Sequence, residues 1–505
     1  MSDGFKLAPV LLLFGFLAIT LLVGLVSRAQ KGQDYTVSGL HVGRMGIGAA
    51  IASNWMSAAS FLGIAGIFYL KGYFALAYVI GWTGGYVLLL ILMAGQIRRF
   101  GKYTAPEFVE ARYDSPAARL LSAAIAILIS LVYCVAQYKG IALVFSWIFG
   151  LDYTASLFLG TTVAISYLVL SGTLGAARNQ QLHYMVLILS FIIPLMFVAK
   201  KLGYFWAVPQ VGYGSALEDL AQGKSAYTSP WTFATPFEWI SLCFTLMVGT
   251  AGLPHVLSHF YTVPNIRDAR WSVIWGIFFI GLLYWSAPAY ATFARVWELN
   301  NQIAPDPATA RAMADLVVIK AGEWAGLSPW LTGIVAVGAI IAAFSTVTGL
   351  LITGAGAFSH DIYYRLINPR ASEGKRMKVA KAATLVLALL VVIVAANPPG
   401  LIAEITAVAF ALAGNTLFPV FLLGIWWDRT NKFGAIAGMI TGLCITFAAL
   451  LLGDLIPLIS TLFPPTSSAF LGAPLVILVM VAFSLATAPP PERIRKFLAE
   501  EVHTP

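Results

Sequence analysis

Charge-free apolar stretches long enough to cross a bilayer constrain this chain more than any other sequence feature. Only 10% of the 505 residues are charged and 59% are apolar, against roughly 25% and 45–50% in soluble domains. A charge at mid-membrane costs at least about 2.5 kcal/mol, so an uninterrupted apolar run of about 20 residues predicts a membrane-spanning helix. A cytosolic protein is excluded. Such runs occur at 7–27, 45–70, 72–97, 153–177, 179–199, 239–266, 271–294, 324–360, 382–403, 405–427 and 433–453.

Two further spans complete the predicted architecture. The segment 120–151 is interrupted only by Lys139, and a proline-rich turn after residue 455 places the last span at about 468–487. We therefore predict an all-α polytopic membrane protein with 13 transmembrane helices, forming a single integral membrane domain over residues 1–505. The first run lacks a small-residue cleavage motif, so we expect a retained span and not a signal peptide.

The distribution of cations predicts the orientation. An odd number of spans puts the termini on opposite sides of the membrane. Of the 31 Lys and Arg residues, 22 fall in the odd-numbered loops and the C-terminal tail, and eight fall on the other side. Cytoplasmic loops carry the excess of Lys and Arg. We expect a plasma (inner) membrane protein with its N-terminus outside and its tail, 488–505, in the cytoplasm. The net charge of +9 then reflects topology, and no nucleic-acid partner is expected.

Motifs that the sequence lacks narrow the function. It contains no G-x-x-x-x-G-K-[ST] loop, H-E-x-x-H, G-x-S-x-G or dinucleotide fingerprint, which disfavours ATP-driven pumping and hydrolytic or redox catalysis. Cys134, Cys243 and Cys444 all lie in apolar runs without pair spacing, so neither a disulfide framework nor a zinc site is expected. We expect no enzyme activity and no cofactor apart from a coupling ion.

Two predicted spans contain helix-breaking and polar residues. The second carries the polar sequence SNWMSAAS at 53–60, and the seventh contains GTAGLPH at 249–255. A single cluster of this kind is more often a packing site or a proline kink. Two clusters five spans apart indicate an inverted-repeat transporter, in which interrupted helices expose backbone groups at mid-membrane.

The ninth span contains a run of hydroxyl residues, AAFSTVT, at 342–348. Such hydroxyls most often bond back to a carbonyl one turn earlier in the same helix. If the broken second span lies opposite, however, adjacent hydroxyls and carbonyls freed from a helix can supply the several oxygens that a hard cation such as Na⁺ requires.

These stretches resemble the sodium:solute symporter family. They occur in order across spans two to eleven, and within the family they are most similar to the cation/acetate and monocarboxylate branch. The stretches that carry the resemblance are NWMSAASFLGIAG (54–66), GKYTAP (101–106), GTAGLPHVLSHFY (249–261), AFSTVTGLL (343–351) with Ser359-His360-Asp361 after it, and AFALAGNTLFP (409–419).

The resemblance implies a five-plus-five inverted repeat, the leucine-transporter fold. The first repeat would cover 45–199 and the second 236–427. Three peripheral helices, at 1–27, 433–453 and 468–487, would lie outside the repeats.

The resemblance also implies a sodium site between the second and ninth spans. Its oxygens would come from the carbonyls of Ser53, Met56 and Ala342 and from the hydroxyls of Ser345 and Thr346. Residues three or four apart share a helix face, so this spacing is physically sensible. Members of the acetate branch carry small apolar residues at the last two positions. The hydroxyl pair here follows the wider family, which favours Na⁺ coupling.

The candidate substrate site lies between the two broken spans. Half-helix N-termini carry partial positive charge and would receive a carboxylate. Phe61 and Leu253 could form apolar walls. The polar candidates are Ser57, Ser60, Thr250 and Gly252 at the breaks, Gln137 and Lys139 on span four, and Asn415 on span eleven.

Lys139 is the least ordinary of these residues. An intramembrane lysine is a functional hypothesis by default, although snorkelling to the interface is an alternative. We expect Lys139 to face the bundle interior and either to pair with Glu404 or to attract an anionic substrate. His255 is expected to support the broken helix, and His259 to be an interfacial residue.

The sequence therefore predicts a sodium-coupled secondary symporter that imports a small organic anion, with a short monocarboxylate such as acetate, propionate, pyruvate or lactate as the leading substrate class. The expected partners are this solute, Na⁺ and the bilayer, while a small partner subunit and the oligomeric state stay open. The alternatives are a proton-coupled carboxylate symporter, and a transporter-like sensor or a channel.

Overall fold

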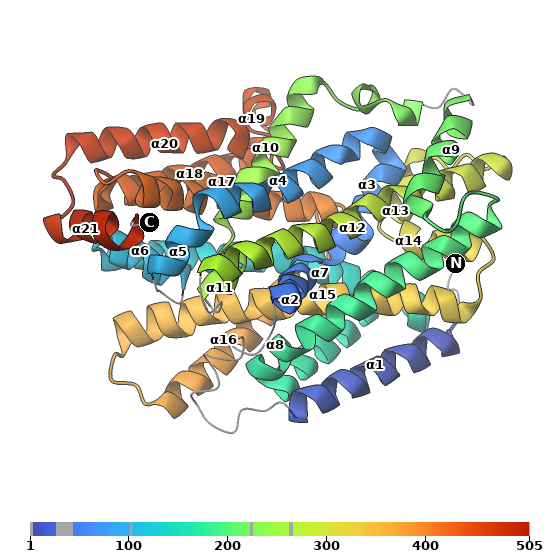
Figure 1. Cartoon of the computed structure of the whole chain (residues 1–505), viewed down its shortest axis with the longest axis horizontal. Helices are drawn as coiled ribbons and strands as arrows, with labels where there is room; N and C mark the ends of the chain where they lie inside the picture. Colours follow the sequence, from blue (N-terminus) through green and yellow to red (C-terminus); the bar gives the residue numbers. More distant parts are fainter. Residues whose placement is uncertain (1–3, 27–43, 101–103, 223–225, 262–265, 504–505) are drawn as a thin grey trace.

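The computed structural model describes residues 4–26, 44–100, 104–222, 226–261 and 266–503. Most helices run along the long axis of the molecule, and the two chain termini lie at opposite ends of it (Figure 1). The helices that correspond to the predicted spans are α1 (Leu7–Val26), α2 (Arg44–Trp55) with η2 (Ala59–Gly63) and α3 (Ile64–Lys71), α4 (Leu76–Leu92) with α5 (Ala94–Phe100), α7 (Pro116–Phe149), α8 (Tyr153–Lys201), α10 (Pro236–Gly252) with α11 (Pro254–Tyr261), α12 (Ile266–Asn300), α15 (Pro329–Gly356) with η6 (Ala357–Ile367), α16 (Glu373–Ala395), α17 (Ile402–Trp426), α18 (Lys432–Leu452) and α20 (Ala469–Ala486).

Within the described ranges, nine helices are long and apolar enough to cross a membrane. Two shorter apolar helices, Leu7–Val23 and Tyr153–Leu168, accompany them. The fifth and sixth predicted spans both fall in α8, whose side chains at 169–179 lie outside the description. An all-α polytopic protein is therefore confirmed, while the count of 13 spans stays a prediction.

The helix ends follow ordinary capping chemistry, which explains why the spans begin where they do. Ser115, Asp152, Ser328 and Asn431 each accept a hydrogen bond from a backbone N–H in the first turn of the helix that follows. Thr235 forms a reciprocal capping box at the start of α10. These oxygens satisfy N–H groups that have no acceptor within the helix.

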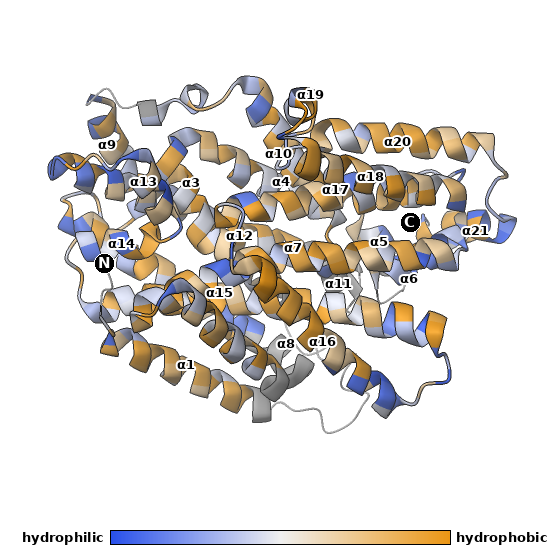
Figure 2. Cartoon of the chain, turned by 180° about the vertical axis from the view of Figure 1, so that it is seen from behind, coloured by the Kyte–Doolittle hydropathy of each residue, from blue (hydrophilic) through white to orange (hydrophobic). Residues whose placement is uncertain are grey.

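The bundle has a buried centre and an apolar periphery. In the spanning windows of α15 and α17, 89% and 83% of residues are buried, against 22% in α16 and 33% in each of α18 and α20. Figure 2 shows the peripheral helices largely in hydrophobic colours, with hydrophilic segments concentrated toward the two ends of the long axis. A lipid-facing exterior with polar ends is the surface that a bilayer requires.

Short helices occupy the two ends. The end that holds the N-terminus also holds α9 (Pro209–Gln222), α13 (Pro307–Ala314) and α14 (Val317–Trp324), which come from the two longest predicted loops (Figure 1). The opposite end holds α6 (Ala105–Tyr113) and α21 (Glu492–Phe497). The remaining short elements are η3 (Gly72–Ala75), η4 (Ala226–Thr228), η5 (Pro230–Thr232), α19 (Pro457–Leu462) and η7 (Leu498–Val502).

Candidate functional site

The second predicted span is interrupted where its polar cluster lies. α2 ends at Trp55, and Met56 and Ser57 have no regular helical structure. The Ser57 hydroxyl then accepts hydrogen bonds from the backbone N–H groups of Ala59 (3.1 Å) and Ser60 (3.4 Å). Ser57 therefore caps the second half of the span, because its oxygen satisfies N–H groups that lack a helical acceptor.

Gln137 of α7 binds the same break from the side. Its side-chain oxygen accepts a hydrogen bond from the backbone N–H of Ala58 (2.8 Å). Its Nε2 atom is buried and has no hydrogen-bond partner among the residues that the structure describes. Buried polar groups are ordinarily satisfied, so this amide can donate to a polar ligand at the break.

The seventh predicted span is also broken. α10 ends at Gly252, Leu253 is extended (φ −75°, ψ 120°), and α11 begins at Pro254. A Cβ atom on Gly249 would lie 2.4 Å from the carbonyl oxygen of Phe410, so glycine is needed for α10 to approach α17 this closely. Both predicted interruptions are thus present in the structure.

The candidate sodium site forms where α15 crosses the end of α2. The Ser345 hydroxyl oxygen lies 2.8 Å from the carbonyl oxygen of Ser53 and 3.1 Å from that of Ala342. The Thr346 hydroxyl donates to the carbonyl of Asn54 (3.2 Å). Carbonyls in the last turn of a helix lack a helical donor, so this crossing gathers oxygens that face one another across two helices.

The structure therefore brings Ser53, Ala342, Ser345 and Thr346 together. Met56 lies in the break itself, just beyond the crossing. Asn54 was not among the predicted residues, although the sequence carries a signal for it. Ser345 and Thr346 are adjacent, and they contact the carbonyls of two adjacent residues, Ser53 and Asn54.

Tyrosine hydroxyls surround the broken span, and sequence reasoning missed them. Tyr133 of α7 donates to the Ser57 hydroxyl (3.4 Å), and the Tyr284 hydroxyl of α12 lies 3.1 Å from that of Ser60. Trp55 donates to the Tyr284 hydroxyl (2.8 Å). Tyr133 precedes Gln137 by four residues and so shares its helix face, which could have identified it. Tyr284 carries no comparable signal.

Aromatic rings close the region around these hydroxyls. Phe410 of α17 packs against Trp55, Trp82 and Tyr133, each with ring centroids 5.6 Å apart. His255, beside the break in α10 and α11, contacts the Tyr133 ring edge-on at 5.6 Å. Such contacts add to area burial and fix ring positions. Packed aromatic rings therefore surround the few hydroxyl and amide groups at the break.

Three predicted substrate residues point elsewhere. The Thr250 hydroxyl donates to the carbonyl of Leu246 in its own helix (2.7 Å), and Gly252 packs against the α17 backbone at Ala413. The Asn415 amide donates to Thr446 and Ser468, at 3.0 Å each, and so faces α18 and α20. Thr250 and Asn415 therefore bond within and between helices, and Gly252 lets α10 approach α17 closely at the break. The His259 side chain lies outside the described residues.

Lys139 does not pair with Glu404, so that expectation was wrong. Its ammonium bonds to the Asp315 carboxylate (2.6 Å) and to the carbonyl of Gly400 (2.8 Å). Glu404 instead caps α17 by accepting from the backbone N–H of Leu401 (3.0 Å), which turns its carboxylate toward Arg311 (2.6 Å). Lys139 thus reaches the junction between α13 and α14.

Asp315 is a buried acid at the junction between α13 and α14. Its side chain is 2% exposed, and its oxygens also accept from the backbone N–H of Ile402 at 3.2 and 3.3 Å. Burial raises the pKa of the Asp315 carboxyl, while the Lys139 ammonium opposes that shift. The charged form of Asp315 therefore depends on Lys139.

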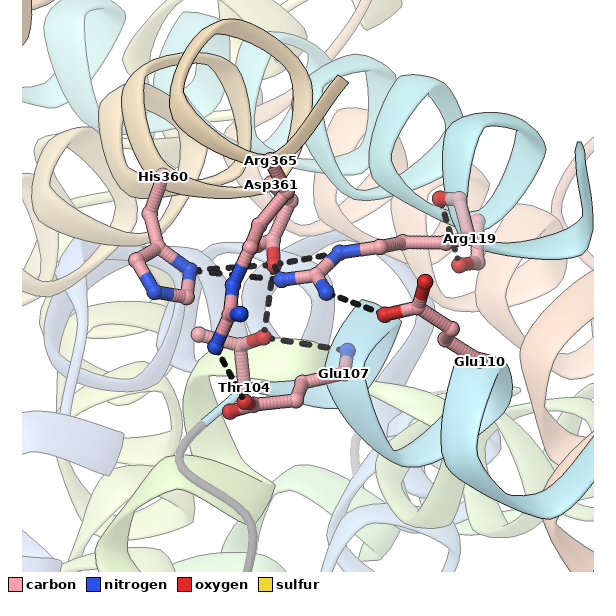
Figure 3. A network of polar contacts seen from close by, with 8 residues as sticks. Thr104, Glu107, Glu110, Arg119, His360, Asp361 and Arg365 are labelled. Carbon is pink, nitrogen blue, oxygen red and sulfur yellow. Dashed lines mark hydrogen bonds and ion pairs between the residues drawn. The ribbon is translucent and has the colours of Figure 1, made fainter. Parts of the chain in front are cut away.

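A second polar network lies at the end that holds α6 and η6 (Figure 3). Arg119, near the start of α7, forms ion pairs with Asp361 of η6 and with Glu110 of α6. Thr104 donates to the same Asp361 oxygen (3.1 Å), and His360 lies 3.2 Å from it. Both Arg119 and Asp361 are at most 1% exposed. The resemblance included the motif that carries His360 and Asp361, but sequence reasoning assigned the motif no role.

The comparisons with known proteins agree with this geometry. The model of the sodium:solute symporter family matches residues 35–442. An uncharacterized symporter of Cupriavidus necator is 31% identical, covering 85% of this chain and 83% of that protein. An uncharacterized symporter of Bacillus subtilis is 30% identical, covering 93% of this chain and 90% of that protein.

Solved structures show the same fold. A Na⁺-coupled sialic acid symporter in a substrate-bound, outward-open state matches with a TM-score of 0.78 at 19% identity, over 97% of this chain and all of that one. Mhp1, a nucleobase-cation-symport-1 family transporter in a closed conformation with bromovinylhydantoin bound, matches with a TM-score of 0.53 at 12% identity, over 91% of this chain and 96% of that one.

The family resemblance and the fold are thereby confirmed, and the matching proteins are transporters and not enzymes. The acetate branch is not confirmed, because the curated relatives are uncharacterized. With a family match over most of its length, this chain belongs to the sodium:solute symporter family and has the leucine-transporter fold.

Proposed function

We propose that this protein is a Na⁺-coupled symporter that imports a short monocarboxylate, such as acetate, propionate, pyruvate or lactate, by alternating access. The observation that carries the proposal is the crossing of α15 with the broken end of α2. There the hydroxyls of Ser345 and Thr346 meet carbonyls of α2. Na⁺ prefers several oxygen ligands, and this crossing offers them without a fixed negative charge.

The region around Ser57 supports a small carboxylate as the solute. Gln137 has a buried N–H group without a partner in the described part of the chain, and Tyr133 has a hydroxyl at the break. The N-terminal end of the second half-helix supplies partial positive charge. An incoming carboxylate would take these donors in place of the Ser57 hydroxyl.

For orientation we propose that the N-terminus lies outside the cell. The excess of Lys and Arg in the loops at the other end supports this choice. The end with α13, α14 and the Lys139–Asp315 pair is then external, and the end with Arg119 and Asp361 is cytoplasmic.

Coupling follows from where the ion would bind. Na⁺ at the crossing would join α2 to α15, and α2 leads directly into the break that holds the solute. An ion that binds one arrangement of these helices better than the other shifts the population toward it. Each ligand would then raise the affinity for the other by the same factor.

Uptake into proteoliposomes tests the proposal. Labelled acetate, propionate, pyruvate and lactate, with one sugar and one amino acid for comparison, are supplied with an inward Na⁺ gradient or with choline in its place at fixed pH. We expect accumulation of at least one carboxylate that requires Na⁺. Equal uptake in choline that depends on a pH gradient would point to proton coupling, and accumulation of only the sugar or the amino acid would contradict the carboxylate assignment.

The double variant Ser345→Ala/Thr346→Ala tests the ion site. Hydrogen bonds to charged groups contribute about 1.5–3 kcal/mol each, so the Na⁺ concentration for half-maximal uptake should rise about a hundredfold or more. Thr332→Ala is the matched control, since within the described ranges this α15 hydroxyl donates only to carbonyls of its own helix end, at Ser328 and Pro329. Unchanged Na⁺ dependence in the double variant would remove these hydroxyls from the site.

A further inference from the structure

The Asp315 carboxylate lies in a site formed by the Lys139 ammonium and the backbone N–H of Ile402, two groups that favour a carboxylate. We call this site the cradle. The Lys139 ammonium lies 2.6 Å from one of its oxygens, and the backbone N–H of Ile402, at the start of the 25-residue helix α17, reaches both oxygens at 3.2 and 3.3 Å. A lysine ammonium and the N-terminal amide of a long helix are both favourable partners for an anion. Asp315 is buried, at 2% exposed, and Lys139 is partly buried, at 13% exposed.

This cradle lies at nearly the same level of α7 as the proposed solute site. Lys139 follows Gln137 by two residues, a rise of about 3 Å and a turn of about 200°, so the two side chains leave different faces of α7. The intervening packing is tight: a Cβ atom on Gly140 would lie 2.7 Å from the Ala58 side chain and 3.4 Å from that of Ile402. The broken second span, α7 and the start of α17 therefore meet at one point, and the cradle is on its external side.

Asp315 itself comes from a different kind of element. It sits between α13 and α14, two helices of eight residues each that connect α12 to α15. The same segment covers α3, where a Cβ atom on Gly66 would lie 2.7 Å from the carbonyl oxygen of Ala314. Asp315 is thus carried by a short connecting segment. Lys139 and Ile402, which bind its carboxylate, belong to the long helices α7 and α17.

We propose that Lys139 and the Ile402 amide form an external binding site for the substrate's carboxylate, and that Asp315 is a tethered stand-in which occupies this site until the substrate replaces it. The inference rests on the proposed function, because it requires an anionic solute. In the exchange one carboxylate replaces another, so Lys139 keeps a negative partner throughout.

The exchange also explains selectivity. A buried lysine that loses its partner is strongly unfavourable. An anionic solute restores the partner that Asp315 gives up, and a neutral solute of the same shape does not. Displacement of Asp315 also frees the α13–α14 junction from Lys139 and Ile402, while the Arg311–Glu404 pair and the contacts of Glu323 with Lys6 and Trp147 still hold the rest of the segment.

Chemical rescue tests the cradle directly. In purified detergent-solubilised protein, Asp315→Ala leaves Lys139 without its carboxylate and creates space for a small one, so the melting temperature should fall by several degrees. Acetate should restore most of that loss, whereas acetamide, and chloride at the same ionic strength, should not. The double variant Lys139→Met/Asp315→Ala should lose the response to acetate. Glu404→Ala, which breaks the exposed pair on the same segment but keeps Asp315, should be stabilised by acetate far less than Asp315→Ala.

A second variant keeps the test decisive if Asp315→Ala is poorly folded. Asp315→Asn keeps the shape of the side chain and an acceptor for Ile402, but removes the competing charge. Calorimetry should show propionate binding at least tenfold tighter than in the wild type, with binding of propionamide unchanged. Equal affinities for propionate in the two proteins, or an acetate rescue that survives loss of Lys139, would overturn the inference.

These measurements do not need transport, so they separate the two proposals. Wild-type protein that accumulates no carboxylate under a Na⁺ gradient contradicts the proposed function. Wild-type protein that accumulates a carboxylate, with variants that show no gain or rescue, contradicts only the role of Asp315.

Discussion

The two ends of this transporter are closed by different kinds of ion pair on the same helix. Each pair centres on a buried aspartate, Asp315 at the proposed external end and Asp361 at the proposed cytoplasmic end, and each receives its cation from α7. Lys139 and Arg119 are 20 residues apart, a distance of about 30 Å in a helix. That matches the thickness of the hydrocarbon core, so α7 carries one cation at each boundary.

The difference lies in how firmly each carboxylate is held. One oxygen of Asp361 receives contacts from Thr104, from two nitrogens of Arg119 and from His360. Asp315 has one ammonium and one backbone N–H. Asp361 belongs to η6, which continues α15, whereas Asp315 lies in a short connecting segment. The Asp361 pair therefore fixes long helices in one geometry, and the Asp315 pair, in the exchange we propose, gives up its ligand.

Removal of Arg119 should produce the largest effect on stability. Arg119→Gln leaves Asp361 buried without its cation, and breaking a buried pair in this way costs about 3–5 kcal/mol. The melting temperature of the purified protein measures the loss. Lys496→Gln is the control, since its pair with Glu492 is exposed at the protein surface. Equal melting temperatures for both variants would contradict a strong contribution of the Arg119–Asp361 pair to stability.

The conservative change Arg119→Lys should have the next largest effect. Lysine cannot reproduce the planar fork that contacts Asp361 twice and Glu110 once. Loss of hydrogen bonds to charged groups costs about 1.5–3 kcal/mol each. If Arg119→Lys melts at the wild-type temperature, the guanidinium geometry stabilises the protein no more than a single positive charge does. The Arg119 pair would then not be held more firmly than the Lys139 pair.

Lys139→Met should cost less, about 1–3 kcal/mol, because Asp315 can neutralise itself by binding a proton. Burial raises the pKa of Asp315, and without the opposing ammonium the folded state keeps this proton to still higher pH. The unfolded aspartate releases its proton at about pH 3.9. The folded state then binds more protons, so stability falls as the pH rises from the unfolded pKa toward the folded one.

The measurement is the melting temperature of Lys139→Met relative to wild type at about pH 5 and about pH 8. We expect a larger deficit at the higher pH. Uptake of carboxylates should be lost at both values, while the protein stays folded in the membrane. A deficit that does not change with pH, or normal uptake, would contradict the role given to this pair.

The sequence was sufficient for features set by local chemistry and insufficient for those set by packing. The breaks at Ser57 and Leu253 could be predicted because hydroxyls, glycine and proline weaken a helix wherever they stand. The contact between Ser345 and Ser53 also followed from the family pattern. Asp315 could not be found, because an acid in a charged loop looks solvated until its burial is known.

Other contacts were unpredictable for the same reason. Thr250 and Asn415 were predicted at the solute site from their place in a motif, and their hydrogen bonds in the structure go to Leu246, Thr446 and Ser468, because the whole bundle sets which helix face meets which neighbour. Glu404 was offered as the partner of Lys139 because it lies near the predicted external start of the eleventh span. A local cap at Leu401 turns Glu404 away, and the actual partner is 176 residues from Lys139 in the chain.

The smallest effects should come from the exposed pair at each end, and these sharpen the comparison most. Arg311, paired with Glu404, and Arg365, paired with Glu107, are 51% and 46% exposed. Exposed pairs contribute about 0.2–1 kcal/mol, so Arg311→Gln and Arg365→Gln should each lower the melting temperature only slightly.

Their effects on uptake should differ, because Arg311 helps to hold the α13–α14 segment, which must move when Asp315 leaves Lys139. Arg311→Gln should therefore lower the KM for a carboxylate modestly, and Arg365→Gln should not. Equal KM values would mean that release of this segment does not limit how the solute reaches its site.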